Sequence, residues 1–156
     1  MTRCVAVIGP GDRATDSECA TARAVGKLLA QHGFNVVCGG LGGVMAAVAE
    51  GVSDAEGLSI GILPTKDRRG ASRHLSVVIP TGLGELRNGL VVGAAEGVIA
   101  IGGSWGTLSE LALAKRLGLP VVSVGGWSVV DSAGSEVAVE QAISADAAVA
   151  RLVELL

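Results

Sequence analysis

The stretch Val98-Ile-Ala-Ile-Gly-Gly-Ser-Trp-Gly-Thr-Leu-Ser-Glu110 decides the fold that we expect for this chain. The β-branched apolar run at residues 98–101 predicts a buried strand that leads directly into three glycines, Gly102, Gly103 and Gly106. We expect a helix to begin among these glycines, with Thr107 in its first turn and Glu110 one turn further on. Glycines at such a turn leave backbone N–H groups uncovered, and a helix N-terminus adds partial positive charge. The stretch therefore predicts a phosphate-binding turn; an ordinary glycine-rich connection is the alternative.

Strand-like and helix-like segments alternate along the whole chain. Short apolar runs predict strands at residues 4–8, 35–38, 59–63, 76–79, 98–101 and 121–124. Helical spacing predicts helices at residues 17–32, with Asp16 or Ser17 as N-cap, at 44–51, 84–95 and 106–117, and over most of 136–156. This order predicts an α/β fold with a single Rossmann-like, doubly wound parallel sheet, helices on both faces, and one domain spanning residues 1–156.

Glycine loops follow three of the predicted strands, at residues 9–11, 39–43 and 102–106. Ligands of doubly wound sheets bind beyond the carboxyl ends of the strands, so neighbouring strands would bring these loops into one crevice. Loop 39–43 lacks bulky side chains and would let a sugar or base approach closely; tight contact between strand and helix is the alternative. The binding residues expected from the first two loops are Gly9, Gly11, Gly39, Gly40, Gly42, Gly43 and Met45, the last also suited to the core.

Composition excludes several classes of protein. The chain has 156 residues, of which 49% are hydrophobic and 17% charged, so a disordered chain is excluded. A net charge of −3 and a scarcity of aromatic residues (two Trp, one Phe, no Tyr) argue against a nucleic acid partner. The longest apolar stretch, residues 90–101, is shorter than a membrane span and contains Glu96, so no membrane partner is expected.

The three cysteines, Cys4, Cys19 and Cys38, are odd in number and lack C-x-x-C spacing. Two of them fall inside predicted strands, where buried thiols are common. This usage is typical of a reduced, cytoplasmic protein. No cluster of His and Cys has the spacing of metal ligands, so no metal site is expected.

Residues Gly9-Pro-Gly-Asp-Arg-Ala14 match the dinucleotide fingerprint G-x-G-x-x-A, but its usual companions are missing. The fingerprint expects a carboxylate at the end of the second strand, and that strand ends in Cys38-Gly39-Gly40. Pro10 also removes one backbone N–H from the turn. An NAD enzyme is therefore disfavoured. A Walker-type nucleotidase is disfavoured as well, because no glycine loop ends in Gly-Lys-Ser or Gly-Lys-Thr.

Three motifs together resemble a known superfamily: Cys38-Gly-Gly-Leu-Gly-Gly-Val-Met45, the pair Arg87-Asn88, and Gly102-Gly-Ser-Trp-Gly-Thr-Leu-Ser-Glu110. They are similar to the superfamily once mislabelled "lysine decarboxylase", which includes the LONELY GUY cytokinin-activating phosphoribohydrolases and the molybdenum cofactor carrier proteins. The resemblance covers Val5 to about Val124. Lysine decarboxylation is disfavoured, because none of the three lysines adjoins a glycine loop that would hold pyridoxal phosphate.

The chain departs from the hydrolase branch at two positions. That branch has P-G-G-x-G-T-x-x-E with an arginine upstream; its glutamate falls on Glu110 and its arginine on Arg87. Its proline, however, falls at Gly102, and Asn88 replaces the lysine that normally follows the arginine. The pattern Gly-Gly-x-x-Gly-Thr, the pair Arg-Asn and the short chain look more like the carrier-type branch.

The resemblance implies two functions that share one site. The first is a binding protein for a phosphorylated, nucleotide-like ligand, either an AMP-like nucleotide or the molybdenum cofactor, with no cofactor required by the protein itself. The alternative is a phosphoribohydrolase that cleaves the N-glycosidic bond of a nucleoside 5′-monophosphate to free base and ribose 5-phosphate. In the alternative, Arg87 and Glu110 are the catalytic residues. The remaining expected binding residues are Arg87, Asn88, Gly102, Gly103, Ser104, Trp105, Gly106, Thr107 and Glu110.

Simpler interpretations stay open for several of these residues. Arg87 is suited to grip a phosphate or to help a leaving base depart, but an ion pair with Glu110 between two helices fits it too. Glu110 is equally suited to be the capping-box partner of Thr107. Trp105 either covers the ligand or lies at a subunit interface. A homo-oligomer, a dimer or tetramer, is expected from the apolar composition and from the resemblance.

Overall fold

The computed structural model describes residues 3–137 and 139–156; residues 1, 2 and 138, part of the predicted domain, lie outside the described residues, and residue 138 also belongs to the predicted helical tail. The strands are β1 (Cys4–Ile8), β2 (Asn35–Cys38), β3 (Ser59–Leu63), β4 (Val77–Pro80), β5 (Gly97–Ile101), β6 (Val121–Val124) and β7 (Glu140–Gln141). The helices are α1 (Asp16–Gln31), α2 (Val44–Asp54), the 3₁₀ helix η1 (Gly84–Arg87), α3 (Asn88–Gly93), α4 (Trp105–Arg116) and α5 (Ala145–Leu155).

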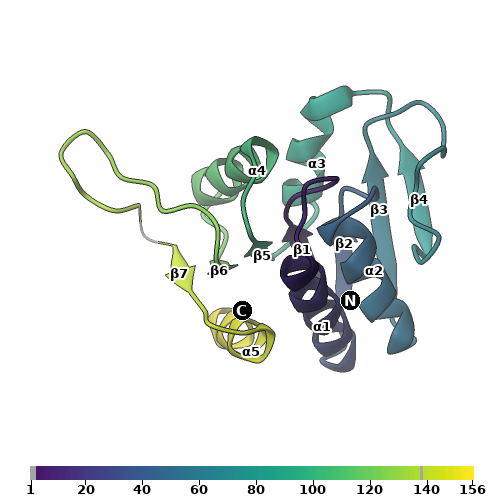
Figure 1. The fold of residues 1–156 in the computed structure, drawn as a ribbon, viewed down its shortest axis with the longest axis horizontal. Helices are drawn as coiled ribbons and strands as arrows, with labels where there is room; N and C mark the ends of the chain where they lie inside the picture. The colour runs from purple at the N-terminus through teal and green to yellow at the C-terminus, as the bar shows by residue number, and fades with distance from the viewer. Residues whose placement is uncertain (1–2, 138) are drawn as a thin grey trace.

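The described strands form one parallel sheet in the order β4-β3-β2-β1-β5-β6-β7. Helices α1, α2 and α5 cover one face of the sheet, and α3 and α4 cover the other (Figure 1). The α/β, Rossmann-like fold predicted from the alternating pattern is therefore confirmed, with helices on both faces. Residues 125–137, which follow β6, extend outward from the edge of the sheet (Figure 1).

The central strands are apolar on both sides because helices cover both faces of the sheet. In β1, Val5 and Val7 belong to the core beneath α1, α2 and α5, whereas Ala6 and Ile8 belong to the core beneath α3 and α4. All four side chains are essentially inaccessible to water. An uninterrupted apolar run, rather than an alternating one, is thus what this position in the sheet requires.

The order of the strands reverses at β1, which lies between β2 and β5. The chain first builds β2, β3 and β4 on one side of β1 and then returns to build β5, β6 and β7 on the other. In doubly wound sheets the crevice at such a reversal is the usual place for a ligand. Because β1, β2 and β5 are neighbours, the glycine loops that follow them meet at one edge of the sheet, as the sequence predicted.

The helix expected at residues 84–95 is instead two short pieces, η1 and α3. Gly84 has a φ of +57°, and Gly89 and Gly93 add further residues of low helix propensity. A 3₁₀ turn is a common connector at such weak points. Arg87 therefore stands at the junction of the two pieces rather than within a continuous helix.

The predicted helical tail also begins too early. Helix α5 starts only at Ala145, with the Ser144 hydroxyl as its N-cap, and the preceding residues form the short edge strand β7 and a bridge between Val130 and Glu136. Smaller differences concern α2, which runs on to Asp54, and β4, which is shifted by one residue. The N-cap of α1 is Thr15 rather than Asp16 or Ser17.

Candidate functional site

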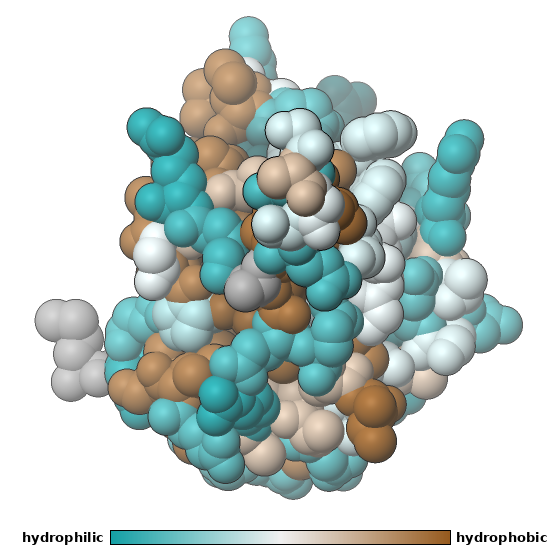
Figure 2. Space-filling model, turned by 90° about the vertical axis from the view of Figure 1, so that its left-hand side faces the viewer, coloured by the Kyte–Doolittle hydropathy of each residue, from teal (hydrophilic) through white to brown (hydrophobic). Residues whose placement is uncertain are grey.

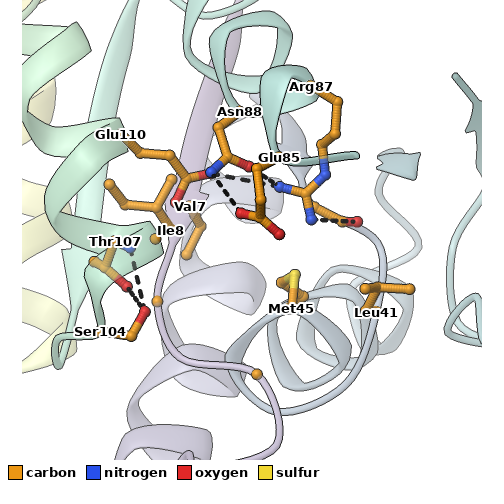
Figure 3. Close-up of a pocket in the computed structure, with 14 residues that line it drawn as sticks. Val7, Ile8, Leu41, Met45, Glu85, Arg87, Asn88, Ser104, Thr107 and Glu110 are labelled. Carbon is orange, nitrogen blue, oxygen red and sulfur yellow. Dashed lines mark hydrogen bonds and ion pairs between the residues drawn. The ribbon is translucent and has the colours of Figure 1, made fainter. Parts of the chain in front are cut away.

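A cavity of about 250 Å³ lies where the loops after β1, β2 and β5 meet (Figure 3). Ten residues expected at the binding site line it: Gly9, Gly11, Gly39, Met45, Arg87, Asn88, Ser104, Gly106, Thr107 and Glu110. Four lining residues were not anticipated: Val7, Ile8, Leu41 and Glu85. Val7 and Ile8 end strand β1 and Leu41 stands among the glycines of loop 39–43, so the sequence indicated where these three lie. Glu85 had no such indication, because the turn of η1 brings it to the cavity.

Ser104 begins helix α4 and supplies a pair of hydroxyl groups to the cavity. Its Oγ accepts a hydrogen bond from the Thr107 N–H at 3.2 Å and lies 2.9 Å from the Thr107 hydroxyl. The N-cap of α4 is therefore Ser104, and the alternative in which Thr107 and Glu110 form a capping box is wrong. The first turn of α4 contains no carboxylate, so its backbone dipole is not neutralised by its own side chains.

The N-terminus of α1, which follows the dinucleotide-like fingerprint, is occupied by its own side chains. Thr15 and Glu18 form a capping box: the Glu18 N–H donates to Thr15 Oγ1 at 3.1 Å, and the Thr15 N–H donates to Glu18 Oε2 at 2.8 Å. Asp16 adds a second carboxylate to the first turn. An anion is repelled from this helix end, so α4 rather than α1 offers the cavity its favourable helix dipole.

Arg87 is a buried cation whose hydrogen-bonding groups are only partly satisfied. It is 7% exposed, and its Nη1 donates to the Asn88 side-chain oxygen while Nη2 lies 3.4 Å from the Gly39 carbonyl oxygen. Its Nε has no hydrogen-bond partner among the described residues. Buried polar groups without partners are costly, so an acceptor that enters the cavity beside this guanidinium would be strongly favoured.

Glu110 lies beside Arg87 and is 6% exposed. Burial raises the pKa of the Glu110 carboxyl from 4.5 to about 7; Arg87 opposes this shift, and Glu85 adds to it. Burial prevails because the shortest distance between Arg87 Nη1 and Glu110 Oε1 is 3.9 Å, the outer limit of an ion pair. The ion pair offered as the simpler alternative thus exists, but it is a weak one that leaves Glu110 able to exchange a proton near neutral pH.

The polar groups lie on different sides of the cavity. In Figure 3, Ser104 and Thr107 are on one side and Arg87 is on the other, with Met45 and Leu41 below Arg87. The Asn88 amide nitrogen lies 3.4 Å from both Glu85 Oε2 and Ser109 Oγ. A ligand that spans the cavity would therefore meet hydroxyls and a helix N-terminus at one end and a guanidinium at the other.

Six residues expected at the site do not line this cavity: Gly40, Gly42, Gly43, Gly102, Gly103 and Trp105. For Gly40 and Gly43 of loop 39–43, the structure supports the alternative that these glycines permit tight backbone contact. A Cβ on Gly43 would lie 2.1 Å from the Gly11 carbonyl oxygen, and one on Gly40 would lie 2.7 Å from Leu63. Gly39 does serve the cavity, because a Cβ there would lie 2.6 Å from Nη2 of Arg87.

Gly102 explains why this chain lacks the proline of the hydrolase motif. Its φ is +61°, and a Cβ would lie 1.9 Å from Glu18 Oε1. Proline fixes φ near −65°, so the ring cannot occupy this backbone conformation. Gly103 in turn leaves room for the indole of Trp127, which a Cβ would approach to 2.8 Å.

Residues 3–137 and 139–156 contain no group of three or more His, Cys, Asp or Glu side chains placed to hold a metal ion. Among the same residues, no helix is both long and apolar enough to cross a membrane.

Comparisons with known proteins show that the chain belongs to the SLOG cluster4 family, whose model matches residues 2–153. The structure is similar to the molybdenum cofactor binding protein of the phototrophic bacterium Rippkaea orientalis (TM-score 0.89, 32% identity, 99% of this chain and 98% of that chain covered). It is also similar to the molybdenum cofactor carrier protein MCP of Chlamydomonas reinhardtii (TM-score 0.87, 29% identity, 99% and 98% covered). An uncharacterized protein of Archaeoglobus fulgidus is 37% identical over 120 residues, which are 77% of this chain and 78% of that protein.

Proposed function

We propose that this member of the SLOG cluster4 family is a carrier-type binding protein for a phosphorylated, nucleotide-like ligand such as a nucleoside monophosphate or the molybdenum cofactor. One observation carries the proposal: the cavity places a buried, incompletely paired Arg87 opposite the hydroxyl-capped N-terminus of α4. Both features favour negative charge or hydrogen-bond acceptors in the ligand. The two similar structures named above as molybdenum cofactor proteins support the same class of ligand.

In this proposal the phosphate lies at the start of α4. The Ser104 and Thr107 hydroxyls share one hydrogen bond, so one of them, together with backbone N–H groups of the first helical turn, donates to its oxygens. Gly106 keeps that turn free of a side chain that would cover those groups. The anion is not opposed by any carboxylate of the first turn of α4.

The ring system of the ligand extends from the phosphate across the floor of the cavity. Met45 and Leu41 provide an apolar surface for a planar ring, and Arg87 faces a ring oxygen or nitrogen that accepts a hydrogen bond. Glu110 accepts from a ring N–H when ionised and donates when protonated. The molybdenum cofactor fits this donor set through its pterin and its phosphate.

The phosphoribohydrolase alternative uses the same cavity. Burial raises the pKa of Glu110 to about 7, the range in which a carboxyl group serves as a general acid or base. Against it stands the backbone at Gly102, which cannot accommodate the proline of the hydrolase motif. Release of free base from AMP, followed by chromatography, distinguishes turnover from binding.

Two matched serine variants test the binding proposal. Ser104 and Ser144 each cap a helix by accepting from the N–H three residues on, at 3.2 Å in both cases, but only Ser104 lines the cavity. Ser104→Ala and Ser144→Ala are each expected to lower the free energy of unfolding by about 1 kcal/mol. Only Ser104→Ala should weaken the binding of AMP and of a pterin monophosphate, measured by titration calorimetry.

Any of three results would contradict the proposal. Equal binding by the two serine variants would show that the start of α4 does not hold the phosphate. Release of base that disappears in Glu110→Gln would replace the carrier by a phosphoribohydrolase. Absence of binding by the unaltered protein would remove the nucleotide-like ligand class altogether.

A homo-oligomer is part of the same proposal. Leu86 is 80% exposed, and together with Trp105 and Leu113 it borders a shallow apolar groove between η1 and α4. The face shown in Figure 2, which carries the segment after β6, has apolar and polar residues intermingled instead. Sedimentation analysis of Leu86→Glu tests the groove: a shift to a smaller species supports it as an interface, and an unchanged species excludes it.

A further inference from the structure

A second hollow, of about 310 Å³, adjoins the cavity already described. It lies between the loop after β1 and the start of α4, and Ser104 lines both spaces. Pro10, which borders the second hollow, stands between Gly9 and Gly11, which border the first. A ligand whose phosphate lies at Ser104 can therefore continue from one space into the other.

Both tryptophans of the chain stand at this hollow. Their ring centroids are 5.1 Å apart with an angle of 42° between the planes. Trp127 is fixed by its indole N–H, which donates to the Ser104 carbonyl oxygen at 2.9 Å. Trp105 rests against it and is 78% exposed, which is unusual for a large side chain in a protein with only two other aromatic residues, Trp127 and Phe34. A held but exposed indole is a stacking surface.

The hollow also carries a cation. Arg13 lines it, is exposed, and forms no ion pair among the described residues. Glu18 also lines the hollow, but its carboxylate is engaged in the capping box with Thr15, so Arg13 is the charged side chain at the hollow that is left for a ligand. The second hollow thus combines an aromatic face with a guanidinium. Proteins that bind single-stranded nucleic acids use the same two features to hold bases and phosphates.

We propose that this hollow is a second nucleotide subsite, so that the ligand is of the dinucleotide class. Its base stacks on Trp105, and a pyrophosphate runs from Ser104 toward Arg13, joining this base to the phosphorylated group in the first cavity. The proposal rests on the proposed function and names its substrate class more closely. It also gives the Gly9-x-Gly loop a role: the loop borders both spaces, although the N-terminus of α1 behind it is closed to anions.

Intrinsic fluorescence reports on this subsite directly, since both tryptophans of the chain lie at it. The unaltered protein is titrated with AMP and GMP and with the corresponding dinucleoside pyrophosphates, diadenosine and diguanosine pyrophosphate. We expect at least one pyrophosphate to bind at least fivefold more tightly than its mononucleotide and to quench the fluorescence more strongly. Affinities are confirmed by calorimetry, which does not depend on the indoles.

Variants test whether the tighter binding of the dinucleotide arises at the second hollow. Trp105→Ala and Arg13→Gln should each remove most of the advantage of the dinucleotide while leaving mononucleotide affinity within twofold. Leu86→Ala removes an equally exposed apolar side chain outside the hollow, and Arg116→Gln removes an exposed arginine at the far end of α4. Both controls should retain the advantage.

The outcomes separate this inference from the function on which it rests. Mononucleotide binding without any gain for the dinucleotides contradicts the second subsite alone, as does a gain that survives in Trp105→Ala. A loss of equal size in Leu86→Ala, accompanied by a smaller sedimenting species, would mean that the gain depends on the oligomer and not on stacking at Trp105, and it also overturns the subsite. Failure to bind either mononucleotide contradicts the proposed function itself.

Discussion

Replacing Glu110 by glutamine is expected to change how the stability of this protein depends on pH. Burial raises the pKa of the Glu110 carboxyl to about 7 in the folded protein, while in the unfolded chain it returns to about 4.5. The folded state therefore holds this proton more tightly than the unfolded state between those two values. By linkage, the contribution of Glu110 to stability is greatest below pH 4.5 and is lost as the pH rises through about 7.

The size of the effect follows from the shift. Each pKa unit corresponds to 1.36 kcal/mol, so the rise from 4.5 to about 7 amounts to on the order of 3 kcal/mol. Most of this change falls between pH 5 and pH 8. Glutamine has nearly the same shape but does not titrate, so Glu110→Gln removes this part of the pH dependence and leaves the contributions of all other groups in place.

Urea unfolding at pH 5, 6, 7 and 8, followed by tryptophan fluorescence, measures the difference. The free energy of unfolding of the unaltered protein, relative to Glu110→Gln, should fall by about 2 to 3 kcal/mol across this range. Glu96→Gln, an exposed glutamate, is the matched control and should run parallel to the unaltered protein. Parallel profiles for Glu110→Gln as well would refute the reasoning, since they would mean that Arg87 keeps Glu110 ionised despite its burial.

Three further outcomes are expected. Gly102→Ala should lower the free energy of unfolding more than Gly118→Ala. Both glycines have a positive φ, which costs alanine about 1 kcal/mol or more, but only a Cβ on Gly102 would also crowd a neighbouring side chain. Equal melting temperatures of the two variants would contradict this. Arg87→Met should move the midpoint of the Glu110 titration above 7, because Arg87 lowers the pKa of that carboxyl; an unchanged midpoint in the unfolding profiles would show that the ion pair has no weight. Burial raises the pKa of the Cys38 thiol to about 11, so at pH 8 it should resist iodoacetamide until the protein unfolds, and mass spectrometry of labelled peptides would reveal early modification if this is wrong.

The general fold was readable from the sequence because its signals are local. Apolar runs such as Val98–Ile101 mark strands that helices cover on both faces, and Gly33 and Gly118 mark helix ends. Where local signals compete, prediction was less accurate. The glycines at positions 84, 89 and 93 break a segment whose apolar spacing predicts one helix, and β7 forms because the residues before α5 add to the open edge of β6.

The place of Ser104 and Glu110 beside the other glycine loops was also predictable, since glycine loops that end neighbouring parallel strands must meet at one edge of the sheet. Arg87 was expected there from the family resemblance, and it reaches the cavity from η1. The sequence did not show which side chains near this edge line the cavity, nor which of them caps helix α4. Glu85 lines the cavity although no sequence motif indicated it. The capping role expected of Thr107 belongs to Ser104, because side-chain direction depends on where each helix begins.

The sequence by itself determined the α/β class, the strand that leads into the glycine turn at residues 102–106, and the acidic and basic groups available there. These features depend on the spacing of apolar residues and on the backbone freedom of glycine, both of which are local. Only the tertiary structure decided that Glu18 closes the N-terminus of α1 while that of α4 stays open, that Arg87 is buried with an unpaired Nε, and that Trp105 stands against Trp127 beside Arg13. The physical reason is that desolvation and pairing arise from groups distant in the chain, and the folded sheet alone brings those groups together.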